Sequence, residues 1–249
     1  MNAFVLILLP LIAHLAILYF LSRVINRIAY ATLGRGWYLI TQWPGVIVHE
    51  LSHAVACLLT FTRVYEVKLF APSDETLGYV THADTKNPFK RIIISTAPLF
   101  GSTIVIWLIV KYLMPDLYID MQSTISTHTA ANIRAYAQYF ISLFTNIDFT
   151  DWRTYVFLYA MIAIASHAAP SKPDMKHALW GIIGVLLLIG LLFGISNATD
   201  VDVLKNVGTW IQGPAQFMTA FLAYSIIFSL LALVALFPFV LLKRALHRT

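Results

Sequence analysis

Five consecutive residues, His49-Glu50-Leu51-Ser52-His53, combine two imidazoles and a carboxylate within a largely apolar stretch. Four residues apart on a helix, His49 and His53 project from one face and can hold one zinc ion. Glu50 lies beside them, where it could take a proton from a zinc-bound water. The type and spacing of these residues therefore predict metal-assisted hydrolysis with one zinc ion per chain.

The surroundings of this motif strengthen that prediction. Residues 43–59 are mostly apolar and suit a lipid bilayer. Burying an ionised Glu and two His there costs several kcal/mol of free energy unless they are paired or bound to metal. The alternative is a polar cluster whose hydrogen bonds are satisfied by neighbouring helices, without any metal.

Composition indicates an integral, multi-pass membrane protein. The 249 residues are 59% hydrophobic and 12% charged, and the mean hydropathy is +0.75. A soluble domain would carry about twice that share of charged residues. The net charge of +5 fits cytoplasmic Lys and Arg beside the lipid bilayer, so no nucleic-acid partner is expected. The single cysteine, Cys57, excludes an internal disulfide.

The apolar segments predict an all-α membrane protein, a polytopic bundle of about six transmembrane helices forming a single domain over residues 1–249. Arg23 and Arg27 mark an interface after the first span. Residues 1–20 lack a basic start and a small-residue cleavage site, which favours a retained span over a signal peptide. The six expected spans are residues 4–21, 38–59, 92–114, 155–169, 177–193 and 217–242.

Two connecting segments have patterns of their own. Residues 64–70 alternate as a strand does, residues 71–76 suit a turn, and residues 77–82 suit a returning strand. This β-hairpin after the second helix could offer an open edge to an extended peptide, or could only cap the bundle. Residues 133–147 carry apolar side chains at helical spacing, which predicts an amphipathic helix at the membrane interface that anchors the chain or gates access.

Six spans place both termini on one side of the membrane, and the Lys and Arg bias favours the cytoplasm of a prokaryotic cell membrane. The oligomeric state is not predicted. The cytoplasmic set would contain Arg63, Lys68, Lys86, Lys90, Arg91, Lys172, Lys176, Lys243, Arg244 and Arg248. The opposite set would contain Arg23, Arg27, Arg35, Lys111, Arg134, Arg153 and Lys205.

A catalytic zinc usually has three protein ligands and a water, so one more ligand is needed. Asp174 is the preferred third ligand. Two prolines in residues 167–177 interrupt the helical pattern and leave backbone N–H and C=O groups without helical partners. A membrane tolerates such groups only beside a cavity or at the interface. Alternatively, Ser171 caps a helix and Asp174 merely occupies its first turn. The candidates considered are Asp174, His167, His177, His82, Glu66, Glu75, His128 and His14.

Over residues 43–102 and 166–181 the chain resembles the site-2 protease family of intramembrane zinc metalloproteases. In that family an HExxH helix precedes a small β-sheet, then a helix with a Gly-Pro-x-x-Asn-like stretch, and a later helix supplies an aspartate ligand. Here HELSH matches the first motif, residues 64–82 the sheet, residues 97–101 the second motif and residues 170–174 the third. The resemblance implies that His49, His53 and Asp174 bind zinc and that Glu50 is catalytic.

Departures from the family pattern indicate a divergent member or a sister family. Ala97 stands in place of the family glycine and Gly101 in place of its asparagine, while Met175 follows Asp174 where the family has glycine. The group that polarises the substrate carbonyl is therefore unassigned, with Ser102 as a candidate substitute. No PDZ-like insertion is present.

The favoured hypothesis is an intramembrane metalloprotease that cleaves a membrane-protein or peptide substrate in or near a transmembrane segment. Glu50 would act as base toward water and then as acid toward the leaving amine. The alternative is a non-catalytic membrane protein with a structural or transported metal. A purely structural site has no need of a base, so Glu50 argues for the enzyme.

Overall fold

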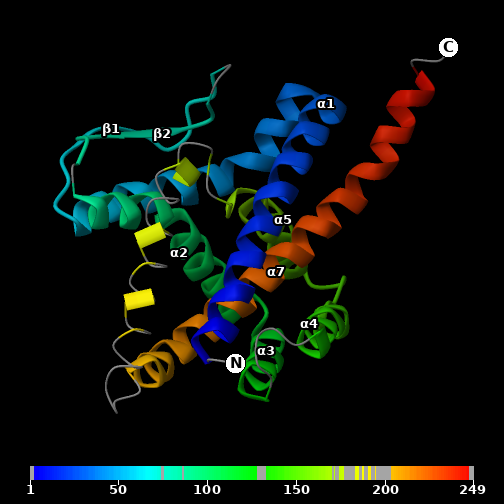
Figure 1. Cartoon of the computed structure of the whole chain (residues 1–249). Coiled ribbons are helices and arrows are strands. Elements are labelled where there is room, and N and C mark those ends of the chain that lie inside the picture. The colour runs from blue at the N-terminus through cyan, green and yellow to red at the C-terminus, as the bar shows by residue number, and fades with distance from the viewer. Residues whose placement is uncertain are drawn as a thin grey trace.

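The structure is a computed structural model of the 249-residue chain. It describes residues 3–73, 76–85, 87–127, 133–169, 171, 174–176, 183–184, 187, 190–191, 194 and 203–246. The described part is mostly helical, with one two-stranded hairpin (Figure 1). The predicted helical class is therefore confirmed.

Helix α1, Ala3–Leu59, contains both of the first two predicted spans. A straight helix of its 57 residues would extend for about 85 Å, far beyond the ~30 Å hydrocarbon core. The chain bends instead at Gly34, whose φ of 76° lies in the left-handed region that favours glycine. The result is a first arm, residues 3–33, and a second arm, residues 35–59. The hairpin thus follows α1 at the end of its second arm, the arm that contains the second predicted span.

The hairpin is formed by β1, Val64–Lys68, and β2, Tyr79–His82. The strands are antiparallel, with Val67 opposite Val80 and Lys68 opposite Tyr79, and a bulge lies between Val64 and Glu66. Both strands were predicted, the first from its alternating pattern and the second as the returning strand after a turn. The hairpin follows the second arm of α1 directly, so it lies close to the end of the HELSH segment (Figure 1).

Helix α2, Pro88–Leu113, agrees with the third predicted span. The Asn87 side chain caps its start by accepting from the backbone N–H groups of Phe89 and Lys90. The helix contains Pro98 in its interior. Helix α3, Pro115–Thr127, follows directly and was not predicted.

The remaining helices also match predicted segments. Helix α4, Ile133–Asn146, is the predicted amphipathic helix, with Tyr139 and Leu143 buried and Phe140 and Phe144 exposed. Helix α5, Trp152–His167, starts at the Asp151 cap. Helix α7 runs over Val203–Leu246 and contains Pro214 and Pro238. Most of the fifth predicted span, residues 177–193, lies outside the described residues.

Among the described residues, three helical segments are long and apolar enough to cross a membrane, namely Ile12–Leu59, Phe89–Leu113 and Gly213–Ala245. A multi-pass membrane protein is therefore plausible. Helix α1 packs against α2, α5 and α7. The largest buried cluster lies where α2, α3, α4, α5 and α7 meet, and includes Ile106, Phe157 and Phe228. The HELSH segment thus belongs to a helix packed on several sides.

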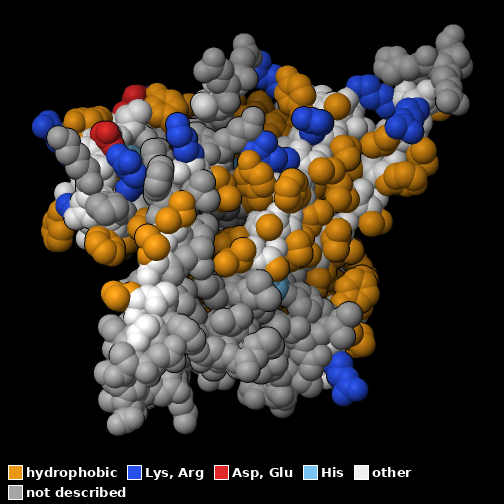
Figure 2. All heavy atoms as spheres, in the orientation of Figure 1, with side chains coloured by type: hydrophobic (Ala, Val, Ile, Leu, Met, Phe, Trp, Pro, Cys, Tyr) orange, Lys and Arg blue, Asp and Glu red, His pale blue; other side chains and the backbone are white. Residues whose placement is uncertain are grey.

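The structure differs from the predicted placement of the charges and of the chain ends. The Lys243 ammonium donates to the carbonyl of Ala31, so the end of α7 lies beside the bend of α1 and near Arg35, which was assigned to the other side. In Figure 1, α1 begins at the lower end and α7 finishes at the upper end. The start of α1 and the end of α7 lie at opposite ends of the view because the second arm of α1 runs across the view instead of back along the first arm. Figure 2 shows Lys and Arg mainly along the upper edge and hydrophobic side chains below.

Candidate metal centre

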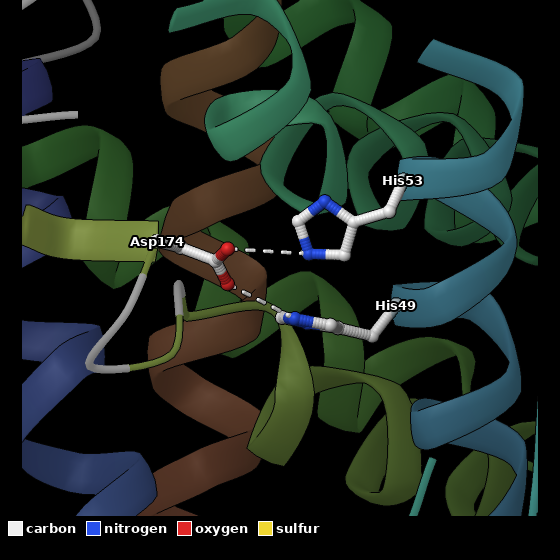
Figure 3. Close-up of side chains that lie close together, drawn as sticks. All are labelled: His49, His53 and Asp174. Atoms are coloured by element: carbon white, nitrogen blue, oxygen red, sulfur yellow. Dashed lines mark ion pairs between the residues drawn. The ribbon is translucent and has the colours of Figure 1, made fainter. Parts of the chain in front are cut away.

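His49 and His53 lie one helical turn apart on the second arm of α1 and project from the same face (Figure 3). Their ring centroids are 5.0 Å apart. Only 8% of His49 and 9% of His53 is exposed, so both imidazoles are shielded from solvent. The helical spacing therefore produces the two-imidazole arrangement that the sequence predicts.

Asp174 reaches the same point from a distant segment of the chain (Figure 3). Its Oδ2 lies 3.3 Å from Nε2 of His49, and its Oδ1 lies 3.4 Å from Nε2 of His53. The three residues form a buried group whose ligand atoms all lie within 4.8 Å of one another. Such a group could hold a metal ion.

Asp174 also takes part in the helix cap that was considered as the alternative. The backbone N–H of Ser171 donates to Asp174 Oδ2 at 3.0 Å, and the Ser171 hydroxyl donates to the same oxygen at 2.6 Å. In return, the Asp174 N–H donates to the Ser171 hydroxyl at 3.3 Å. The two roles are compatible, because the cap fixes the carboxylate in the orientation that faces both imidazoles.

The size of the group fits a small cation. Tetrahedral zinc with bonds of about 2.0–2.2 Å has ligand-to-ligand edges of about 3.3–3.6 Å. The separation of 3.3 Å between His49 Nε2 and Asp174 Oδ2 and that of 3.4 Å between His53 Nε2 and the other carboxylate oxygen, Oδ1, lie in that range. Two imidazoles and one carboxylate are also a donor set that zinc uses in catalytic sites.

The second nitrogen of each ring decides which tautomer is present. Nδ1 of His49 lies 3.1 Å from the carbonyl oxygen of His167, and Nδ1 of His53 lies 2.8 Å from that of Ile94. A carbonyl oxygen can only accept, so each Nδ1 carries a proton and donates. In the neutral imidazoles, each Nε2 then presents a lone pair towards Asp174.

The Asp174 carboxyl is ionised in this environment. Burial alone would raise the pKa of the carboxyl, but hydrogen bonds from the His49 and His53 rings, when Nε2 carries a proton, and from Ser171 lower that pKa well below its usual value. The carboxylate is therefore ionised. When the two Nε2 protons leave, two nitrogen lone pairs and a negative charge converge on one buried point, and a cation there would take the place of those protons.

Glu50 lies beside this point and borders two cavities. The larger has a volume of about 560 Å³ and reaches the hairpin and the start of α2. The smaller, of about 240 Å³, extends to the first arm of α1. His49, Glu50, Gly78 and Ser171 border both cavities. The candidate metal centre therefore has open space on two sides.

Two glycines let neighbouring helices approach the HELSH helix closely. An ideal Cβ at Gly45 would lie 2.2 Å from the carbonyl oxygen of Ala163 on α5. One at Gly101 on α2 would lie 1.9 Å from Oγ of Ser52. Both distances are far below contact distance, so α2 and α5 can pack this closely only because these positions lack a side chain.

The other sequence candidates occupy different places. His167 ends α5 and supplies its backbone carbonyl to His49, while its own ring lies 3.3 Å from the Ser166 hydroxyl. His82 lies on β2 at the larger cavity. Glu66 lies on β1 beside Lys68, and His14 is buried in the first arm. Glu75, His128 and His177 lie outside the described residues.

Ser102, the candidate substitute for the family asparagine, is only 1% exposed. Its hydroxyl has no hydrogen-bond partner among the described residues. The α2 residues that border the larger cavity are instead Arg91, Ile94 and Ser95. The structure thus gives Ser95, rather than Ser102, a place at the cavity wall.

Sequence reasoning missed the polar wall of the smaller cavity. Ser22 and Asn26, one helical turn apart on the first arm, both line it together with Arg23. Ser22 donates to the carbonyl of Ser166, and the Asn26 amide donates to Ser22 at 3.4 Å. The four-residue spacing of Ser22 and Asn26 was the available signal. Nothing in the sequence indicates that this arm faces Glu50.

Comparison with known protein families, curated proteins and solved structures found no match for this chain. The geometry of the site therefore carries the functional argument.

Proposed function

We propose that this protein is an intramembrane zinc metalloprotease, a divergent member or sister of the site-2 protease family. The observation that carries the proposal is the convergence of the two Nε2 lone pairs of His49 and His53 with the Asp174 carboxylate, at a point where Glu50 borders open space. A purely structural zinc site is usually closed by four protein ligands. Three ligands beside a cavity support catalysis instead.

Each residue has a role in this proposal. His49, His53 and Asp174 hold the metal, which when bound supplies Lewis acidity to a water and to the scissile carbonyl. Glu50 accepts the proton of the attacking water and then delivers it to the leaving amine. The carbonyls of Ile94 and His167 keep the two imidazoles in the tautomer that binds metal.

The larger cavity is the proposed substrate site. Tyr79, Val80 and His82 of β2 border it together with the metal-binding group. In the described sheet, β2 pairs only with β1, so its other edge can pair with an extended peptide. A transmembrane segment that unwinds at this edge would bring its backbone beside Glu50.

The membrane arrangement belongs to the same proposal. The two arms of α1, with α2, α5 and α7, would belong to the predicted bundle of about six membrane helices. The Lys and Arg side chains along the upper edge in Figure 2 favour placing the hairpin end on the cytoplasmic side.

A substitution at Glu50 tests the proposal. Wild type, Glu50→Gln and the control Glu66→Gln are placed in vesicles with a panel of tagged single-span substrates, and cleavage and bound zinc are measured. Glu66 is a suitable control because it is a half-exposed carboxylate on β1, ion-paired with Lys68. Glu50→Gln should keep zinc and abolish cleavage, since glutamine is nearly isosteric but cannot accept the proton.

Two results would contradict the proposal. Cleavage by Glu50→Gln at the wild-type rate would exclude Glu50 as the base. Wild-type protein that binds no zinc, even when zinc is supplied in excess, would remove the metal centre altogether.

A further inference from the structure

The hydrogen bond from His53 to Ile94 uses a backbone carbonyl in the interior of a helix. Inside an α-helix, the carbonyl of residue i accepts from the N–H of residue i+4. Ile94 lies within α2, Pro88–Leu113, so its carbonyl would ordinarily be occupied by the N–H of residue 98. Yet this oxygen lies 2.8 Å from Nδ1 of His53 on the neighbouring helix.

Residue 98 is proline, which explains why the oxygen is available. Proline has no N–H, so the carbonyl four residues earlier loses its helical donor. The proline ring also clashes with that carbonyl and tilts it away from the helix axis. Pro98 thus leaves the Ile94 oxygen without the donor that residue 98 would otherwise supply, and Nδ1 of His53 takes that place.

The hydrogen bond between His53 Nδ1–H and the Ile94 carbonyl gives a partner to two buried polar groups, each of which would be unfavourable without one. Ile94 is 3% exposed and His53 is 9% exposed, so water is largely excluded from the bond. An unpaired carbonyl or ring N–H at such a depth is unfavourable. Each group therefore needs the other, and the bond orients the ring so that Nε2 faces Asp174.

We infer that Pro98 is a positioning residue of the metal centre, because it reserves the Ile94 carbonyl for Nδ1–H of His53 and so fixes the metal-binding tautomer. This inference rests on the metal site of the proposed function but not on proteolysis. It gives the helix-interior proline a role in metal binding.

Restoring a backbone N–H at residue 98 should weaken zinc binding without destabilising the helix. In Pro98→Ala, the new backbone N–H competes with His53 for the Ile94 oxygen. The ring then loses its orienting partner, and zinc affinity should fall by about 10- to 100-fold, as is typical when a partner behind a metal-binding histidine is lost. The metal-free helix should be at least as stable, because alanine is a better helix former than proline.

The test compares three variants with wild type in detergent micelles. Pro98→Ala adds the N–H, whereas lactic acid incorporated at position 98 has the alanine side chain but an ester in place of that N–H. Pro238→Ala is the matched control, since Pro238 is also inside a helix and the Val234 carbonyl that it frees lies on an exposed residue. Zinc affinity is measured by chelator competition, metal-free stability by thermal unfolding, and the His53 tautomer by ¹⁵N NMR.

The inference predicts weak zinc binding and a changed His53 tautomer in Pro98→Ala only, with the lactic acid and Pro238→Ala proteins close to wild type. Equal affinities and tautomers in the alanine and lactic acid variants would overturn it. A Pro98→Ala protein that fails to fold would also overturn it, because the inference expects a helix that is no less stable. Wild type without zinc affinity would refute the proposed function, and the metal-free tautomers would still test Pro98.

Discussion

Gly78 lies directly against the Glu50 side chain: an ideal Cβ at position 78 would be only 2.9 Å from Cγ of Glu50. The same Cβ would lie 2.8 Å from the carbonyl oxygens of Lys68 and Leu69. The returning chain of the hairpin therefore passes between β1 and the proposed catalytic base. This contact relates the position of the hairpin to the orientation of Glu50.

Gly78→Ala should reduce catalysis more than metal binding. The added methyl group meets two backbone oxygens that cannot move independently, so the hairpin or Glu50 must shift. A displacement of about 1 Å at a reacting group can cost about 100-fold in rate, so we expect a 10- to 100-fold loss of cleavage rate with zinc retained. Gly213→Ala is the control, because nothing lies within 4 Å of its Cβ position. Unchanged kinetics in Gly78→Ala would contradict the role of this contact.

Asp174→Asn separates the metal-binding role of Asp174 from its capping role. Asparagine keeps an oxygen that can accept from Ser171 but loses the negative charge beside the two imidazoles. We expect a severe loss of zinc affinity, measured by chelator competition, with at most about 1 kcal/mol lost from the metal-free free energy of unfolding.

Ser171→Ala provides the comparison for that experiment. It removes the hydroxyl that donates to Asp174 but leaves the carboxylate in place. Its zinc affinity should therefore fall much less than that of Asp174→Asn. If the two variants bound zinc equally well, a structural role for Asp174 would be the better explanation.

The close helix contacts at Gly45 and Gly101 predict a ranked loss of stability. Gly45→Ala directs its methyl group at the backbone of Ala163, whereas Gly101→Ala meets the side chain of Ser52. We expect both to lower the free energy of unfolding by roughly 1–3 kcal/mol, with Gly45→Ala the more harmful because backbone yields least. Thermal unfolding in detergent measures this, and a Gly45→Ala protein as stable as wild type would contradict the packing.

The local parts of this fold were predictable from sequence because each has a short-range signal. The four-residue spacing of His49 and His53 places both on one helix face, and the alternation in residues 64–70 marks a strand. Helix α3 was missed because its residues, such as Asp116, Asp120 and Gln122, are too polar to resemble a span. The apolar periodicity that predicted the other helices is weak there.

The long-range parts could not be predicted in the same way. A glycine with positive φ at residue 34 sets the angle between the two expected spans of α1, and the sequence does not specify that backbone angle. Asp174 could be proposed as a ligand or as a cap, but the pattern could not show that one carboxylate does both. The polar wall formed by Ser22 and Asn26 depends on how the first arm packs against the second.

The bond between His53 and Ile94 also bears on how related sequences would diverge. Position 94 contributes only its backbone oxygen to the ring, so any apolar residue that fills the same buried space beside Cys57 and Ala97 can replace isoleucine. Position 98 must lack a backbone N–H, and proline is the only one of the twenty amino acids without one. Replacement of Ile94 by such an apolar residue would therefore leave the bond to His53 intact, whereas we expect proline at 98 and histidine at 53 to be kept or lost together during evolution.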